Sequence, residues 1–283
     1  MCFADGMDAG WLKPVEETAL LTAYARALDS RRPRSILGDT LADEVVGKID
    51  YDFSGLGVIR SVACDVALRA KMLDNRIRAF TAEHPDSVVV DIGAGLDSAV
   101  FRVDPPPTVD WYSVDLPAVI RLRDAVLPRR DRSHSVAKSV AEPDWVNEIP
   151  AHRPTVVVAD GLFAFLSEAV IVAILRRITE HFRFGMVAFN DYGTVGRLNV
   201  VAGKVFPTRR RMVRMLATQW DFRGFKDAHH PEAWNPNLTL IEEASAMQEA
   251  DLSLFPPLVR LRGRMAAHFA VIERKARILC YRF

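Results

Sequence analysis

A run of branched apolar residues that ends in two closely spaced glycines constrains the fold of this chain more than any other feature. Residues 88–92 read Val-Val-Val-Asp-Ile, and Gly93 and Gly95 follow directly. A short, nearly continuous run of β-branched residues is typical of an interior strand in a parallel sheet. Glycine allows a sharp turn and lets the backbone come close to a ligand. The sequence therefore predicts a buried strand that leads into a nucleotide-binding turn.

A second predicted strand, residues 109–115, ends in the carboxylate of Asp115. This acid follows the glycines by about 20 residues, the interval at which a Rossmann-like unit places a carboxylate on the ribose hydroxyls of its cofactor. The third glycine of the dinucleotide fingerprint is replaced by Ser98, which disfavours an NAD-linked oxidoreductase. S-adenosylmethionine, which has a ribose and an amino-acid tail but no phosphates, fits better. A turn that only joins a strand to a helix is the alternative.

Strands and helices alternate through the middle of the chain, which predicts an α/β fold with a doubly wound, Rossmann-like sheet. Further strands are expected near residues 134–136, 155–159, 186–189, 238–241 and 278–283, and helices near 15–28, 39–49, 61–83, 97–102 and 167–182. We expect residues 1–85 to form an N-terminal helical cap at the ligand-binding edge of the sheet. Residues 86–283 would form the core, with a lid insertion at about 193–236.

Charge and cysteine content narrow the range of partners. With 37 basic and 36 acidic residues, the formal net charge of +1 gives no general attraction to nucleic acid or to an anionic membrane. Cys2, Cys64 and Cys280 are widely scattered, so we expect neither a disulfide framework nor a metal site. No segment resembles a signal peptide or a membrane span. A cytoplasmic protein with a small-molecule partner is expected, and its oligomeric state is left open.

Several short motifs are similar to those of a known family. They are Glu-Thr-Ala-Leu at 17–20, Asp-Ser-Arg at 29–31 with Ile-Leu at 36–37, Ile-Asp-Tyr-Asp-Phe at 49–53, Gly-Ala-Gly-Leu-Asp at 93–97, Val-Asp-Leu-Pro at 114–117, and Tyr-Arg-Phe at 281–283. In these motifs the chain resembles the leucine carboxyl methyltransferase superfamily, and within it the tetracenomycin-type polyketide O-methyltransferases. The resemblance implies a class I S-adenosylmethionine-dependent methyltransferase of secondary metabolism, built on a mostly parallel sheet of seven strands.

The resemblance also implies roles for individual residues in holding the cofactor. Arg69 would pair with the methionine carboxylate, Gly93 and Gly95 would lie under the methionyl part, Asp115 would bind the ribose, Ser139 and Val140 would border the adenine, and Asp160 would lie near the amino-acid end. Arg69 could instead be a solvated helix residue, and Asp160 a helix cap. The chain departs from the family pattern at Ala99, Ser139 and Asp160. These departures keep a non-catalytic cofactor-binding protein open as an alternative.

Methyl transfer is an in-line displacement that depends on positioning, so a dedicated base is optional. Candidates that line the acceptor pocket are Tyr24, Trp220 and Phe222, and candidates for a catalytic role are Asp191, Tyr192, His229 and His230. The histidine pair could deprotonate a phenol or simply lie in solvent. A run of arginines could attract an acidic substrate or form the solvent-exposed face of a helix; its members are Arg209, Arg210, Arg211 and Arg214.

The expected function is therefore O-methylation of a small, aromatic or polyketide-like hydroxyl or carboxyl. A protein C-terminal carboxyl methyltransferase is the alternative enzyme. The two differ in the acceptor site, because a peptide tail needs an open, positively lined groove and an aromatic metabolite needs a closed apolar pocket.

Overall fold

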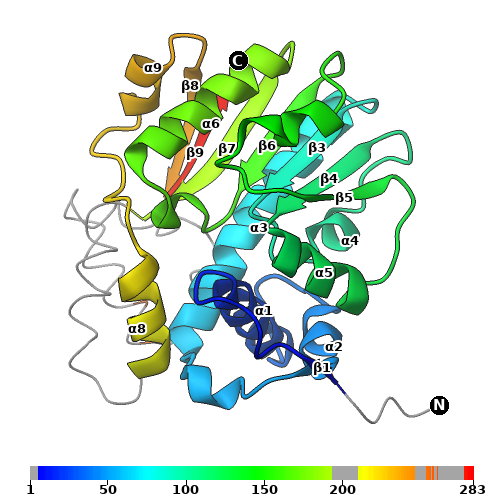
Figure 1. Ribbon diagram of the computed structural model, residues 1–283, viewed down its shortest axis with the longest axis vertical. Helices are drawn as coiled ribbons and strands as arrows, with labels where there is room; N and C mark the ends of the chain where they lie inside the picture. The colour runs from blue at the N-terminus through cyan, green and yellow to red at the C-terminus, as the bar shows by residue number, and fades with distance from the viewer. Residues whose placement is uncertain (1–5, 193–209, 246–252, 256, 258–259, 261–276) are drawn as a thin grey trace.

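The computed structural model of the protein describes residues 6–192, 210–245, 253–255, 257, 260 and 277–283 (Figure 1). Its centre is a seven-stranded sheet in the order β5-β4-β3-β6-β7-β9-β8. The strands are β3 (Val88–Ile92), β4 (Asp110–Asp115), β5 (Ser133–Ala137), β6 (Thr155–Ala159), β7 (Gly185–Asp191), β8 (Thr239–Ser245) and β9 (Arg277–Arg282). Neighbouring strands from β5 to β7 are parallel, and β9 runs antiparallel to β7 and β8. The predicted Rossmann-like, mostly parallel sheet is confirmed.

Helices cover both faces of this sheet and one of its ends. They are α1 (Glu17–Ser30), α2 (Ala42–Gly47), α3 (Arg60–Glu83), α4 (Ala99–Val103), α5 (Pro117–Val126), α6 (Glu168–His181), α8 (Arg210–Gln219) and α9 (His230–Trp234). Short 3-10 turns lie at η1 (Ser54–Leu56), η2 (Pro143–Glu148) and η3 (Phe163–Phe165), and β1 (Met7–Asp8) pairs with β2 (Ile49–Asp50). Sequence analysis missed α5. Pro117 at its first position, where a missing N–H costs nothing, is the signal that could have indicated it.

The hydrophobic core consists of two layers separated by the sheet. Every residue of β3 and β6 is buried, and alternate side chains point to opposite faces. On one face, Val90 and Val157 pack with Ile174 of α6, and on the other, Val89 and Val156 pack with Met72 of α3. Burial on both faces explains why these strands read as unbroken apolar runs.

The N-terminal helices gather at one end of the sheet, where α1 packs against α2 and α3 (Figure 1). Helix α3 belongs to this cap and also to a sheet layer, because its second half covers β6, β7 and β9. The division after residue 85 stays a prediction. Of the predicted lid, residues 193–209 lie outside the described residues, while α8 buries Met212 and Met215 against the cap.

The helices that the structure describes include none with the length and apolar character needed to cross a bilayer.

Candidate functional site

The glycine turn lies where β3 ends. Gly93 and Gly95 both have left-handed backbone conformations, with φ of +69° and +52°. A Cβ at position 93 would come within 3.0 Å of the Leu162 side chain, and one at position 95 within 3.4 Å of the Ala19 Cβ in α1. Larger residues would therefore be strained in backbone conformation at both positions, and at position 93 they would also be crowded by Leu162. The turn is held between the cap and the segment that follows β6.

Asp115 is the last residue of β4 and holds the turn by hydrogen bonds. Its Oδ2 accepts from the Gly95 N–H at 2.7 Å, and its Oδ1 accepts from the Leu116 N–H at 2.7 Å. Burial raises the pKa of Asp115, and these two backbone bonds oppose the increase. Each carboxylate oxygen has a second lone pair. The side chain can therefore accept further hydrogen bonds from a ligand with adjacent hydroxyls.

Arg69 of α3 joins the cap to the carboxyl end of β6. Its guanidinium is buried, donates through Nε to Asp160 Oδ1 at 3.0 Å and through Nη1 to Asp65 Oδ2 at 2.8 Å, and lies 5.0 Å from the Tyr192 ring centre. Burial lowers the pKa of Arg69, and the nearby carboxylates more than offset this effect. Three of the predicted site residues, Arg69, Asp160 and Tyr192, are thus in contact.

Carboxylates crowd around the glycine turn. Asp91, the fourth residue of β3, is buried, and burial together with the negative charge of Asp97 raises its pKa to about 7. Asp115 and Asp160 act in the same direction, whereas Arg123 opposes them. Asp97 and Asp160 are paired with arginines, so Asp91 and Asp115 supply the remaining negative charge near the turn, which favours a ligand with positive charge.

Two buried arginines stabilise the turn through hydrogen bonds and ion pairs. Arg123 of α5 donates through Nη1 to the backbone oxygens of Gly95 at 3.1 Å and Asp97 at 2.6 Å. Arg102 of α4 pairs with Asp39 at 2.9 Å, Asp74 at 2.9 Å and Asp97 at 2.5 Å. These pairs connect the turn to α3 and to the segment between α1 and α2. Sequence analysis missed this network because its members are up to 63 residues apart.

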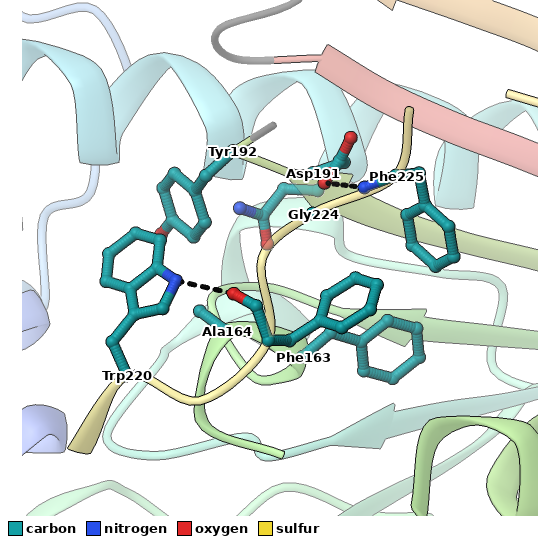
Figure 2. A pocket seen from close by; sticks show the side chains of 9 residues that line it. Phe163, Ala164, Asp191, Tyr192, Trp220, Gly224 and Phe225 are labelled. Atoms are coloured by element: carbon teal, nitrogen blue, oxygen red, sulfur yellow. Dashed lines mark hydrogen bonds between the residues drawn. The ribbon is translucent and has the colours of Figure 1, made fainter. Parts of the chain in front are cut away.

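A narrow hollow lies beside the Arg69 cluster. Its lining residues are Phe163, Ala164, Asn190, Asp191, Tyr192, Trp220, Phe222, Gly224 and Phe225. Figure 2 shows the rings of Tyr192 and Trp220 side by side, and their centres are 5.0 Å apart. The Trp220 indole N–H donates to the Phe222 backbone oxygen at 2.8 Å. Three residues predicted for the acceptor region, Tyr192, Trp220 and Phe222, therefore surround one space.

Asp191 lines the hollow, but its carboxylate is engaged in a buried ion pair. Its Oδ2 accepts from Arg277 Nε at 3.0 Å and lies 2.9 Å from Nη2, while its Oδ1 accepts from the Phe225 N–H at 3.2 Å (Figure 2). Both partners belong to the scaffold, β9 and the loop after α8. The geometry assigns Asp191 to holding these segments together, in place of the predicted catalytic role.

An Asp191→Asn variant is expected to lower the free energy of unfolding by about 2 kcal/mol, because it removes the buried one of the two carboxylates that pair with Arg277 and leaves the partly exposed Glu243. Denaturant unfolding followed by circular dichroism measures this change. Asp65→Asn, at a partly exposed position that shares Arg69 with Asp160, is the control and should cost less than about 1 kcal/mol. Unchanged stability of the Asp191 variant, with lost activity, would restore the catalytic interpretation.

The structure does not bring the histidine pair to the hollow. His229 is exposed and pairs with Glu232 at 2.6 Å, while His230 contacts the rings of Phe225 and Trp234. Both lie at α9, beside β8 and away from α1 and α8 (Figure 1). The aromatic loop was expected to carry them to the acceptor, but it passes the hollow at residues 220–225 and continues along the sheet.

The remaining predicted residues lie elsewhere around the site. Tyr24 packs on Phe53, with ring centres 5.3 Å apart. Ser139 follows β5, and its Oγ accepts from the Ala141 N–H at 3.3 Å. Val140 is buried in the core. Within the described residues, no group of three or more His, Cys, Asp or Glu side chains could hold a metal ion.

Comparison with known proteins assigns the chain to a family. The leucine carboxyl methyltransferase family model matches residues 19–179, more than half of the chain. The tetracenomycin polyketide synthesis O-methyltransferase TcmP of Streptomyces glaucescens is 45% identical over 179 residues, which cover 63% of this chain and 66% of TcmP, just under two thirds of its length. The S-adenosyl-L-methionine-dependent methyltransferase dpfgK of Gibberella zeae is 31% identical over 65% of this chain and 68% of its own.

Solved structures share the fold. A methyltransferase-type crystal structure from Thermobifida fusca YX aligns with a TM-score of 0.57 over 97% of this chain and 99% of its own, at 15% identity. The plantazolicin methyltransferase BamL aligns with a TM-score of 0.51 over 95% of this chain and 98% of its own, at 9% identity. The chain belongs to the leucine carboxyl methyltransferase family, and its cofactor is S-adenosylmethionine.

Proposed function

We propose that this protein is a methyltransferase and that it acts on an oxygen of a small, planar acceptor, either an aromatic hydroxyl or a carboxyl of the polyketide type. The observation that carries the proposal is the aromatic hollow beside Arg69 and Asp160. Ring systems pack favourably on aromatic side chains such as Tyr192 and Trp220. TcmP, whose name specifies polyketide O-methylation, supports the same acceptor class.

The residues around the glycine turn fit the cofactor. We assign Asp115 to the ribose hydroxyls, since its oxygens keep free lone pairs, and the left-handed turn at Gly93 and Gly95 to the methionyl part. Arg69 would hold the methionine carboxylate by charge and geometry. The surrounding carboxylates would complement the ammonium and sulfonium charges. Ser139 and Val140 would border the adenine, as the family resemblance implies.

The bound cofactor supplies an electrophilic methyl group on a sulfonium sulfur. The chain's own residues position the acceptor oxygen and exclude water from the hollow. Burial raises the pKa of Tyr192, and this exceeds the opposite effect of Arg69. Tyr192 therefore remains protonated at neutral pH and acts as a packing surface and hydrogen-bond donor. An ionised carboxylate needs no base, and a phenol would lose its proton to solvent or during transfer.

The peptide-tail alternative requires accessible positive charge, and one member of the arginine run is already engaged. Arg211 Nη2 donates to the Tyr51 hydroxyl at 2.8 Å and lies 3.4 Å from Glu17 Oε1. This contact attaches α8 to the cap. Arg211 is therefore paired with cap residues and is not a free cation for an acidic peptide tail.

Transfer of a labelled methyl group from S-adenosylmethionine tests the proposal. We expect label in aromatic hydroxyl or carboxyl compounds and none in a peptide with a C-terminal leucine. Label in the peptide alone would establish the protein carboxyl methyltransferase, and no transfer to any acceptor despite cofactor binding would establish the non-catalytic binder.

A Trp220→Ala variant should raise KM for an aromatic acceptor about 3- to 10-fold, the loss expected for one aromatic contact of about 0.5–1.5 kcal/mol. Its affinity for S-adenosylhomocysteine should not change. Steady-state kinetics and calorimetry measure the two effects, and Trp11→Ala, at an exposed tryptophan, is the matched control. An unchanged KM would remove Trp220 from the acceptor site.

A further inference from the structure

The hollow contains a buried amide that sequence analysis did not single out. Asn190 is the sixth residue of β7, and only 4% of its surface is exposed. Its Oδ1 accepts a hydrogen bond from the Gly161 N–H at 2.5 Å. Its Nδ2 has no hydrogen-bond partner among the described residues. The side chain lines the hollow, so this unused donor is available to a ligand there.

The orientation of the amide is fixed by its partner. The Gly161 N–H can only donate, so the atom that faces it must be the amide oxygen, and the NH2 group must occupy the other position. Gly161 follows Asp160, which binds Arg69. The amide is therefore attached to the same segment that we assign to the amino-acid end of the cofactor.

The Asn190 Nδ2 group is a buried hydrogen-bond donor among mostly aromatic side chains. A buried N–H without an acceptor costs about 1–3 kcal/mol, and native proteins retain few of them. Most of the other lining side chains are aromatic. The Tyr192 hydroxyl lies on the same side of the hollow, 3.6 Å from the place where a Cβ on Gly161 would be. The Asn190 amide lies close enough to this hydroxyl to lower its pKa, although outside hydrogen-bond geometry, and the opposite effect of burial is larger, so the hydroxyl stays protonated.

We propose that Asn190 Nδ2 donates a hydrogen bond to a carbonyl or carboxylate oxygen of the methyl acceptor, and so selects aromatic acceptors that carry such an oxygen near the methylated one. This inference rests on the proposed function. The narrow hollow accepts a small polar substituent, while the ring lies against Tyr192 and Trp220. An amine at the same place would set its own N–H donors against the Nδ2 donor of Asn190, so such an acceptor should bind poorly.

Two acceptors with the same ring test this contact: 2-acetyl-1-naphthol, whose carbonyl oxygen keeps a second lone pair beside its internal hydrogen bond to the hydroxyl, and 2-ethyl-1-naphthol, which lacks that oxygen. Affinity is measured with S-adenosylhomocysteine present, by quenching of tryptophan fluorescence, since Trp220 lines the hollow. The wild type should bind the acetyl compound about 10-fold more tightly, the effect of one buried hydrogen bond of about 1.4 kcal/mol.

An Asn190→Asp variant keeps an oxygen for the Gly161 N–H and replaces the NH2 donor with an acceptor. It should reduce the preference for the acetyl compound to less than 2-fold and leave the affinity for S-adenosylhomocysteine unchanged. Asn147→Asp, at an exposed position in η2, is the matched control and should keep the full preference.

Nuclear magnetic resonance of the wild type provides a test that does not depend on the variant's folding. The side-chain 15N resonance of Asn190 should shift when the acetyl compound binds and stay in place with the ethyl compound. A preference that survives in Asn190→Asp, or an absent preference in the wild type, would overturn the inference alone. Failure of the wild type to bind S-adenosylhomocysteine would overturn the proposed function itself.

Discussion

Replacement of Arg102 with alanine is expected to lower the free energy of unfolding by about 3–5 kcal/mol, the cost of breaking a buried ionic cluster on one side. The Arg102 side chain is 6% exposed and serves three carboxylates, those of Asp39, Asp74 and Asp97. Within the described part of the chain, its removal leaves Arg26 to pair with Asp97 at 3.4 Å and with Asp39 at 3.7 Å, and leaves Asp74 with the more distant charge of Arg78. Chemical denaturation measures the loss.

The pH dependence of this loss has a defined sign. In the wild type, burial raises the pKa of Asp97, but Arg102 and Arg26 more than offset this, so the pKa lies below its usual range. The resulting stability is present above the unfolded pKa, about 4, and is lost as pH falls. Without Arg102, burial dominates and the folded pKa rises, so the variant should lose stability as pH rises. The difference in the free energy of unfolding between wild type and variant should therefore be smaller at pH 5 than at pH 7.5.

Arg130→Ala is the control for Arg102, because Arg130 forms an exposed pair with Asp104 at 3.0 Å. Such a pair contributes less than about 1 kcal/mol. If the two variants proved equally stable, the buried network would not be what attaches the cap to the glycine turn.

An Asp115→Ala variant is expected to raise the Kd for S-adenosylhomocysteine about 10- to 100-fold. It removes the carboxylate that we assign to the ribose, and a hydrogen bond to a charged group contributes about 1.5–3 kcal/mol. It also frees the Gly95 N–H, which Asp115 now holds at 2.7 Å. Asp115→Asn should have a smaller effect, because an amide oxygen can still accept from that N–H. Calorimetric titration measures both.

Asp124→Ala is the matched control for Asp115, since Asp124 lies on the exposed side of α5 and accepts a hydrogen bond from Ser135 at 2.6 Å. Its affinity for S-adenosylhomocysteine should equal that of the wild type. Wild-type affinity in Asp115→Ala would place the ribose elsewhere.

The features that could be predicted from sequence are those with local causes. Residues 88–92 are buried on both faces of the sheet, and so they read as an unbroken apolar run. Gly93 and Gly95 need left-handed backbone, and glycine adopts it readily. Asp115 ends a strand beside them, because the carboxyl ends of parallel strands meet at one edge.

The features that sequence analysis missed depend on contacts between distant segments. Asp191 resembled a catalytic acid because it follows an apolar strand, but its partner Arg277 lies 86 residues further along the chain. The histidine pair shares a loop with Trp220, and composition does not show where along the sheet that loop passes. Asn190 has no motif, and its significance arises only from the Gly161 N–H that orients it.

Calorimetric titration of the wild type with S-adenosylmethionine, S-adenosylhomocysteine and NAD tests the account most directly. The carboxylates around the glycine turn and the serine at position 98 predict saturable binding of the first two at one site per chain and no binding of NAD. Binding of NAD without binding of either S-adenosyl compound would contradict the account.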